Sequence, residues 1–157
     1  MKKLAPIILI ALTMLLCACS SGGQDSQKTL SDVWSDIKQE VSFQDFNEYT
    51  SIKNLDRHYG ITEEMVDEFA GGINGSGVNQ EEIVLIKAKD SESADKIKEA
   101  LDTRFESKLN QNKNYNAEQA KMIGGCKVEQ DGTYVAMIVS DNAAEISEIY
   151  HRETNTK

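Results

Sequence analysis

One segment near the middle of the chain restricts the fold more than any other. Residues 82–88 read EIVLIKA, a nearly continuous apolar run rich in β-branched residues, which predicts a strand in the middle of a sheet. Asp90 then provides a cap for a helix that we expect to reach Gln111. The apolar residues of this helix recur at helical spacing, at Ala94, Ile97, Leu101, Phe105 and Leu109. We therefore expect Val84 and Ile86 to form a core with Ile97, Leu101 and Phe105.

Shorter helices are expected on both sides of this unit. Thr29 or Ser31 can cap an N-terminal helix whose apolar stripe is Leu30, Val33, Trp34, Ile37 and Val41. Residues 116–119 resemble a capping box and start a short helix through Met122. A C-terminal helix is expected from Asn142, with its inward face formed by Ala143, Ile146, Ile149 and Tyr150.

The sheet is less completely specified. Asp131-Gly132 lies between two strand-like segments, 126–130 and 133–140, and predicts a hairpin. Residues 64–74 fit either a helix or an extended segment before a turn at 74–77, and residues 42–55 fit a short helix or turns. The expected fold class is α+β. Its sheet is mostly antiparallel and carries one long amphipathic helix, preceded by an N-terminal helix and followed by a short C-terminal helix.

The N-terminus has the composition of an export signal. Lys2 and Lys3 precede an apolar run over 4–16 that is too short for a permanent membrane span, which needs about 20 residues. The run ends in Leu16-Cys17-Ala18-Cys19, which resembles the bacterial lipoprotein box. Its small residue lies just before Cys19, whereas bulky Leu16 lies before Cys17, so Cys19 is the expected lipidation site. The other interpretation is a plain secretory signal with two incidental cysteines.

These observations divide the chain into three parts. Residues 1–18 are the expected lipoprotein signal peptide, residues 19–29 the lipidated Cys19 with a flexible polar tether, and residues 30–157 a single small domain. The anchor would hold the protein at the outer face of the cytoplasmic membrane. The net charge of −9 would become more negative without the signal lysines, so we expect no nucleic-acid partner.

Candidate reactive residues are few. Cys126 has no disulfide partner in the mature chain and is expected to be a small buried hydrophobe, with Lys127 facing the other side of the strand. His58 and His151 are the only histidines and lack metal-ligand spacing. We therefore expect no metal, no cofactor and no catalytic residue. A structure with either histidine hydrogen-bonded to a buried Asp or Ser would favour an enzyme.

Several segments together resemble a known family. They are Tyr59-Gly60-Ile61, the strand and turn over 82–90, the helix with Arg104, Tyr115 before the capping box, and the run 132–140. This set, over roughly 43–149, resembles domain of unknown function 4358, a family of short lipoproteins from Gram-positive, mainly clostridial, bacteria. The resemblance implies a lipoprotein without an assigned activity and carries no catalytic residues.

The function expected from the sequence is a membrane-anchored, non-enzymatic binding or interaction module. Its partners would be the membrane, through the lipid anchor, and an envelope protein or ligand of unknown identity. A small cell-envelope enzyme and an accessory subunit of a membrane complex are the alternatives. An exposed apolar patch of more than a few hundred Å² would favour the accessory subunit.

Overall fold

A five-stranded antiparallel sheet forms the centre of the computed structural model, which describes residues 28–157. The order across the sheet is β1-β2-β3-β5-β4. The strands are β1 (Phe46–Glu48), β2 (Val66–Asn74), β3 (Glu82–Ala88), β4 (Lys127–Asp131) and β5 (Tyr134–Val139). The expected α+β class with a mostly antiparallel sheet is confirmed, and so is the hairpin at Asp131-Gly132, where Gly132 has φ +58°.

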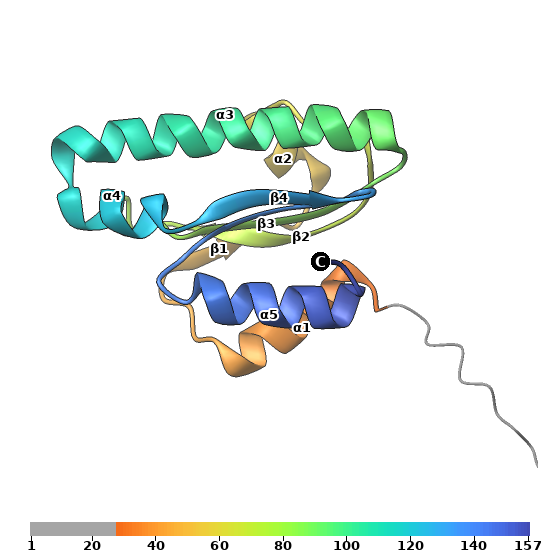
Figure 1. Cartoon of the computed structure of the whole chain (residues 1–157), viewed down its shortest axis with the longest axis horizontal. Coiled ribbons are helices and arrows are strands. Elements are labelled where there is room, and N and C mark those ends of the chain that lie inside the picture. The colour runs from red at the N-terminus through yellow and green to blue at the C-terminus, as the bar shows by residue number, and fades with distance from the viewer. Residues whose placement is uncertain (1–27) are drawn as a thin grey trace, which may run out of the picture.

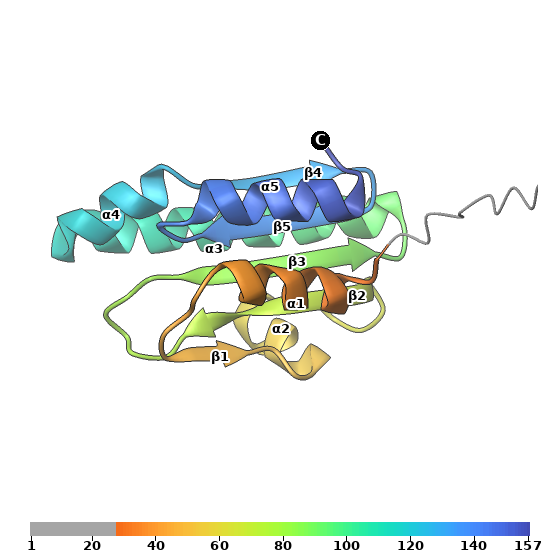
Figure 2. The same cartoon turned by 90° about the horizontal axis from the view of Figure 1, so that it is seen from below.

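Helices cover both faces of this sheet (Figures 1 and 2). They are α1 (Leu30–Glu40), α2 (Ile52–Tyr59), α3 (Ser91–Tyr115), α4 (Ala117–Gly124) and α5 (Ala143–Thr154). The first and last helices, α1 and α5, pack on one face, whereas α2, α3 and α4 pack on the other. The N-terminal, long and C-terminal helices are therefore present as expected, and the long helix continues four residues beyond Gln111.

The composition of β3 follows from its position between the two helical layers. Val84 and Ile86 face α3, while Ile83 and Leu85 face α1 and α5, and all four are completely buried. The expected core is confirmed for Val84, Ile86, Ile97 and Leu101, but Phe105 is only partly buried at its edge. A strand covered on both faces needs apolar residues at every position, which explains the continuous run.

Residues 66–74, for which the sequence left helix and strand open, form strand β2. Gly71 has φ +117°, and a side chain there would collide with the carbonyl of Ile83 on β3. A Cβ on Gly72 would collide with Asn47 and Phe46 on β1. The glycine pair therefore lets the two neighbouring strands approach β2 closely.

Residues 42–55, for which the sequence left a short helix or turns open, contain the start of a helix and also a strand that the sequence did not predict. The short edge strand β1 is followed by α2, where the Ser51 side chain accepts a hydrogen bond from the Lys53 amide. At the start of the described chain, Thr29 caps α1 and Lys28 forms ion pairs of 2.7 Å with Asp36 and Glu153. The predicted signal peptide and most of the predicted tether, including Cys19, lie outside the described residues.

Candidate functional site

A buried carboxylate lies where β3 begins, on the face of the sheet that α3 covers. The side chain of Glu82 is completely buried. Its Oε1 accepts hydrogen bonds from Arg104 Nε at 3.0 Å and from the Tyr59 hydroxyl at 2.7 Å. Its Oε2 accepts one from Arg104 Nη2 at 2.8 Å and lies 2.8 Å from Lys108 Nζ. We refer to Glu82, Arg104, Lys108, Tyr59 and Tyr49 as the Glu82 cluster.

The two cations of the cluster are one helical turn apart on α3. Lys108 is almost as buried as Glu82, with 4% of its side chain exposed, whereas Arg104 keeps 31% exposed. Lys108 Nζ also donates to the backbone oxygen of Gln80 at 3.0 Å and to its side-chain oxygen at 3.2 Å. The Tyr49 and Tyr59 hydroxyls share a short hydrogen bond. Every charged group of the cluster therefore has hydrogen-bonding partners, as burial requires.

These contacts set the ionisation of the cluster. Burial alone would raise the pKa of Glu82, but hydrogen bonds from Arg104 and the charge of Lys108 outweigh it and hold that pKa below its ordinary value. Burial lowers the pKa of Lys108 despite the nearby carboxylate. Burial also raises the pKa of both tyrosines, which keeps their hydroxyls neutral. A carboxylate held ionised in this way is suited to structural support rather than to proton transfer.

The sequence analysis assigned no role to this cluster, although three of its members carry the family resemblance. A signal was nevertheless present. The buried stripe Ala94–Ile97–Leu101 continues at helical spacing through positions 104 and 108, where it places two cations on the core face. Two cations at core positions, together with an acid at the start of an apolar strand, predict a buried ion pair. This continuation of the stripe also explains why Phe105 lies at the edge of the core.

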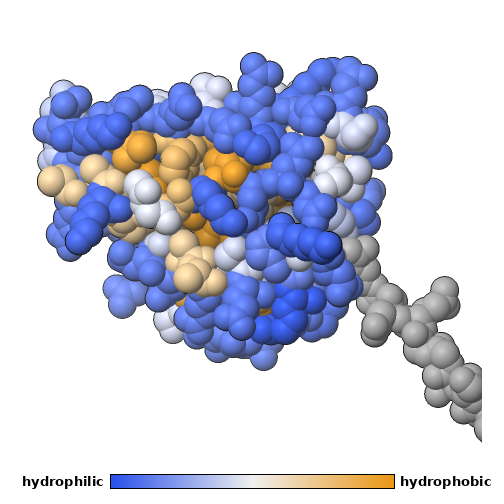
Figure 3. All heavy atoms as spheres, in the orientation of Figure 1, coloured by the Kyte–Doolittle hydropathy of each residue, from blue (hydrophilic) through white to orange (hydrophobic). Residues whose placement is uncertain are grey.

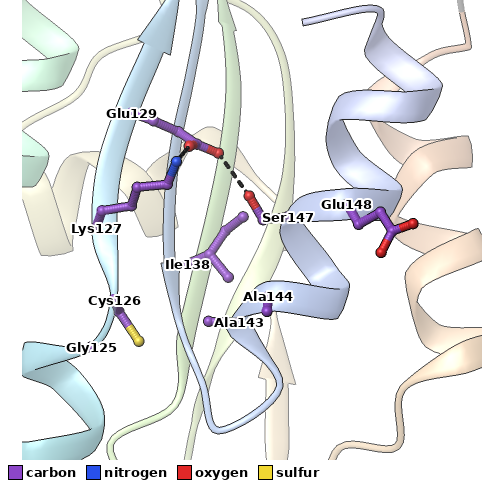
Figure 4. Close-up of a pocket in the computed structure, with 9 residues that line it drawn as sticks. All are labelled: Gly125, Cys126, Lys127, Glu129, Ile138, Ala143, Ala144, Ser147 and Glu148. Atoms are coloured by element: carbon purple, nitrogen blue, oxygen red, sulfur yellow. Dashed lines mark hydrogen bonds and ion pairs between the residues drawn. The ribbon is translucent and has the colours of Figure 1, made fainter. Parts of the chain in front are cut away.

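A groove lies on the other face of the sheet, between β4 and α5 (Figure 4). It has a volume of about 440 Å³, within the range of ligand pockets. Its floor is formed by Ile138 of β5, Cys126, and the small side chains of Ala143 and Ala144. Lys127, Glu129, Ser147 and Glu148 form a polar rim. We call this feature the β4–α5 groove.

Apolar side chains gather in the same region of the surface. In Figure 3 they lie between α3 and α5, where β4 and α4 are located, and hydrophilic surface surrounds them. A second hollow between α4 and the start of α5 continues the groove, because the two share Cys126, Ala143 and Ala144. Met122 and Ser140 contribute to this continuation. The groove is therefore part of a longer concave surface along the edge of the sheet.

Cys126 is half-buried at one end of the groove. Its thiol lies 3.2 Å from the Met122 carbonyl and 3.6 Å from that of Ser140, and both contacts use the thiol as donor. Burial raises the pKa of the thiol, which disfavours the nucleophilic thiolate. Lys127 was expected on the opposite side of the strand, but both residues line the groove because Cys126 lies just before β4 begins.

The groove rim holds a compact polar group. Glu129 Oε1 accepts a hydrogen bond from Ser147 at 3.3 Å and lies 3.0 Å from His151 Nε2. Its Oε2 makes no hydrogen bond but forms an ion pair with Lys127. His151 Nδ1 contacts Thr156 at 2.8 Å. Both imidazole nitrogens are thus engaged, and the serine hydroxyl points to the carboxylate instead of to the imidazole.

The other candidate residues are not brought together. His58 packs against the rings of Tyr49 and Tyr59 on α2's side of the sheet, far in the fold from His151 on α5. Within residues 28–157 no group of three or more His, Cys, Asp or Glu side chains is arranged to hold a metal ion. In the same range, no helix is both long and apolar enough to cross a membrane.

Comparison with known families agrees with the motifs that meet in this fold. Residues 39–140 match the family described as Domain of unknown function (DUF4358). The chain belongs to this family. The matched region contains the whole Glu82 cluster and strands β1 to β5, but it ends before α5 and so includes only one wall of the β4–α5 groove. No curated protein and no solved structure matches the chain.

Proposed function

We propose that this DUF4358 protein is a lipoprotein of a Gram-positive cell envelope that acts as a non-enzymatic binding module. Cys19 would carry the lipid, and the domain would lie on the outer face of the cytoplasmic membrane. The observation that carries the binding role is the β4–α5 groove. Its apolar floor and polar rim have the composition of a site that buries the apolar part of a ligand and orients its polar part.

Two features of the described residues favour binding over catalysis. Activation of a serine commonly uses an imidazole that accepts its proton, but Ser147 donates at 3.3 Å to the carboxylate of Glu129, which is ion-paired with Lys127 and lies between Ser147 and His151. The two buried carboxylates are Glu81 and Glu82, and both are engaged on both oxygens. Glu81 accepts hydrogen bonds from Ser140 and Asn79, and Glu82 accepts them from Tyr59 and Arg104 and lies against Lys108. We therefore find, among the described residues, no serine that is paired with an imidazole and no buried carboxylate that is free to act as the base of a small envelope enzyme.

The position of the groove suits an anchored protein. Lys28, the first described residue, contacts Glu153 near the end of α5, so the tether would enter at that end of the domain. Ala143 and Ala144 lie at the opposite end of α5, away from that entry point (Figure 1). The groove would therefore remain open to ligands or envelope proteins while the lipid is in the membrane.

Site-specific photo-crosslinking in cells tests this proposal. The photoreactive residue p-benzoyl-phenylalanine is placed at Ala144, in the groove, or at Glu145, an exposed control position on the same helix. We expect ultraviolet light to produce a discrete adduct from position 144 and not from 145. A protein-sized adduct would identify the accessory-subunit form of the function, and a small one a ligand. No adduct, or the same adduct from both positions, would contradict the proposal.

A further inference from the structure

A second cleft lies on the opposite side of the sheet from the groove and shares no residue with it. It has a volume of about 530 Å³ and opens between the end of α2 and the outer side of α3. Its lining includes His58, Tyr59, Lys96, Glu99, Arg104 and Ser107. Arg104 is the member that joins this cleft to the buried Glu82 cluster, and we call the feature the Arg104 cleft.

The cluster beneath the cleft carries more positive than negative charge. Two cations, Arg104 and Lys108, contact the single carboxylate of Glu82. Lys108 is buried and already engages Glu82 and Gln80, so only Arg104 is exposed to a ligand. The cluster thus carries one more positive than negative charge in a protein whose net charge is −9, and Arg104 is the part of it that a ligand can reach.

The guanidinium of Arg104 is also oriented for recognition. Its Nε and Nη2 form the side-on pair with Glu82, which fixes the plane of the group. Nη1 makes no hydrogen bond with any residue between Lys28 and Lys157. The end-on edge, formed by Nη1 and the second Nη2 proton, is therefore left with two parallel donors, the geometry that matches a planar carboxylate.

Neighbouring side chains would complete such a site. Ser107 lies one turn further along α3, on the same strip as Arg104, and its hydroxyl accepts from Gln111 while keeping its own proton to donate. Lys96 lies at the other end of the strip and adds a second positive charge, although it is paired with Glu92. Glu99 is the one lining residue whose charge would oppose an anion.

We infer that the Arg104 cleft is a binding site for the carboxylate group of a small ligand. Arg104 holds the carboxylate through its end-on edge, Glu82 positions Arg104, and Ser107 donates a further hydrogen bond. The site is independent of the ligand or partner of the β4–α5 groove, because the two lie on different faces and use different helices.

Nuclear magnetic resonance on the full chain in detergent micelles tests this inference, with the Arg104 Nε–H and the Ser107 amide as readouts. The probes are sodium acetate, inorganic phosphate and sodium chloride at matched ionic strength. We expect acetate to produce saturable shifts that chloride does not. Glu99→Gln should tighten acetate binding about threefold by removing the opposing charge, whereas Glu106→Gln, an exposed control on α3, should not.

Further variants separate recognition from folding. Ser107→Ala should weaken acetate binding about threefold with an unchanged melting temperature. Arg104→Lys, which keeps the charge but loses the fork, should weaken it about tenfold or more. Equal shifts with chloride, saturation by phosphate but not by acetate, or unchanged binding in both Glu99→Gln and Ser107→Ala would overturn the inference. These outcomes do not depend on the crosslinking result, which concerns only the groove.

Discussion

Glu82 combines full burial with a negative charge in a strand whose next four residues are apolar. The cost of removing that carboxylate from water is large, and its neighbours offset it only because Arg104, Lys108 and Tyr59 all contact it. The three donors come from two separate helices, so the cluster joins α2 and α3 to the sheet. The hydrogen bonds and ion pairs of the cluster hold α2 and α3 in one position against the sheet, whereas apolar contacts alone are less directional.

Neutralising this residue should destabilise the domain. In Glu82→Gln the side chain keeps its size, but the buried Lys108 and the partly exposed Arg104 lose their counter-charge. We expect a loss of about 3–5 kcal/mol in the free energy of unfolding, measured by urea denaturation. Glu106→Gln is the matched control, since Glu106 is exposed on α3, and it should change stability by less than about 0.5 kcal/mol. Equal stability of the two variants would show that the cluster does not support the fold.

The same carboxylate should contribute to the pH dependence of stability. The pKa of Glu82 is lower in the folded protein than its ordinary value of 4.5, so the unfolded chain binds its proton more readily. Its stabilising contribution is therefore present above about pH 4.5 and is lost as the pH falls through the folded pKa. Unfolding measured between pH 7 and pH 3 should lose stability less steeply in Glu82→Gln than in the wild type. Parallel curves would contradict this assignment.

At the scale of elements, a helix or strand could be predicted from the sequence when the pattern that specifies it lies within its own residues. Strand β3, helix α3 and the Asp131-Gly132 hairpin each carry a complete signal in their own residues, and all three are confirmed. For β2, Val66, Phe69 and Ile73 fit helical spacing, and pairing with β3 decides the strand. Strand β1 has only three residues and leaves no periodic signal.

The two candidate sites were harder to predict for the same reason. The Glu82 cluster joins residues up to 59 positions apart in the chain, and the β4–α5 groove depends on how a helix rests on an edge strand. Only the cations at core positions of α3 gave a local signal. The groove has none, because alanine, isoleucine and serine at these spacings are typical of any amphipathic helix on a sheet.

Core substitutions on α3 should follow the observed burial, not the full predicted stripe. Leu101 is completely buried between α3 and the sheet, so Leu101→Ala should cost about 2–5 kcal/mol. Phe105 is only partly buried, so Phe105→Ala should cost less than the 3–5 kcal/mol or so typical of a buried phenylalanine. Lys98→Ala should be nearly neutral, because Lys98 is partly exposed and its ion pair with Asp102 is an i,i+4 pair at the helix surface. Thermal or urea unfolding gives the order, and a larger loss for Phe105→Ala than for Leu101→Ala would contradict it.

At the scale of the whole molecule, the proposed anchor and the proposed binding surfaces lie in different parts of the chain. The described domain begins beside the end of α5, and the β4–α5 groove and the Arg104 cleft lie on opposite faces of one sheet. An extracytoplasmic module tethered at one end could thus present both surfaces at once. The proposal that this module works at a membrane surface depends on lipidation of Cys19.

Metabolic labelling with radioactive palmitate tests that dependence most directly. The full chain is produced in a Gram-positive host as the wild type, as Cys19→Ser and as Cys17→Ser, and labelled protein is followed in the membrane fraction. The account predicts label in the wild type and in Cys17→Ser, because Cys17 is removed with the signal peptide, and no label in Cys19→Ser. Label retained by Cys19→Ser, or no label in the wild type, would contradict the proposed lipoprotein.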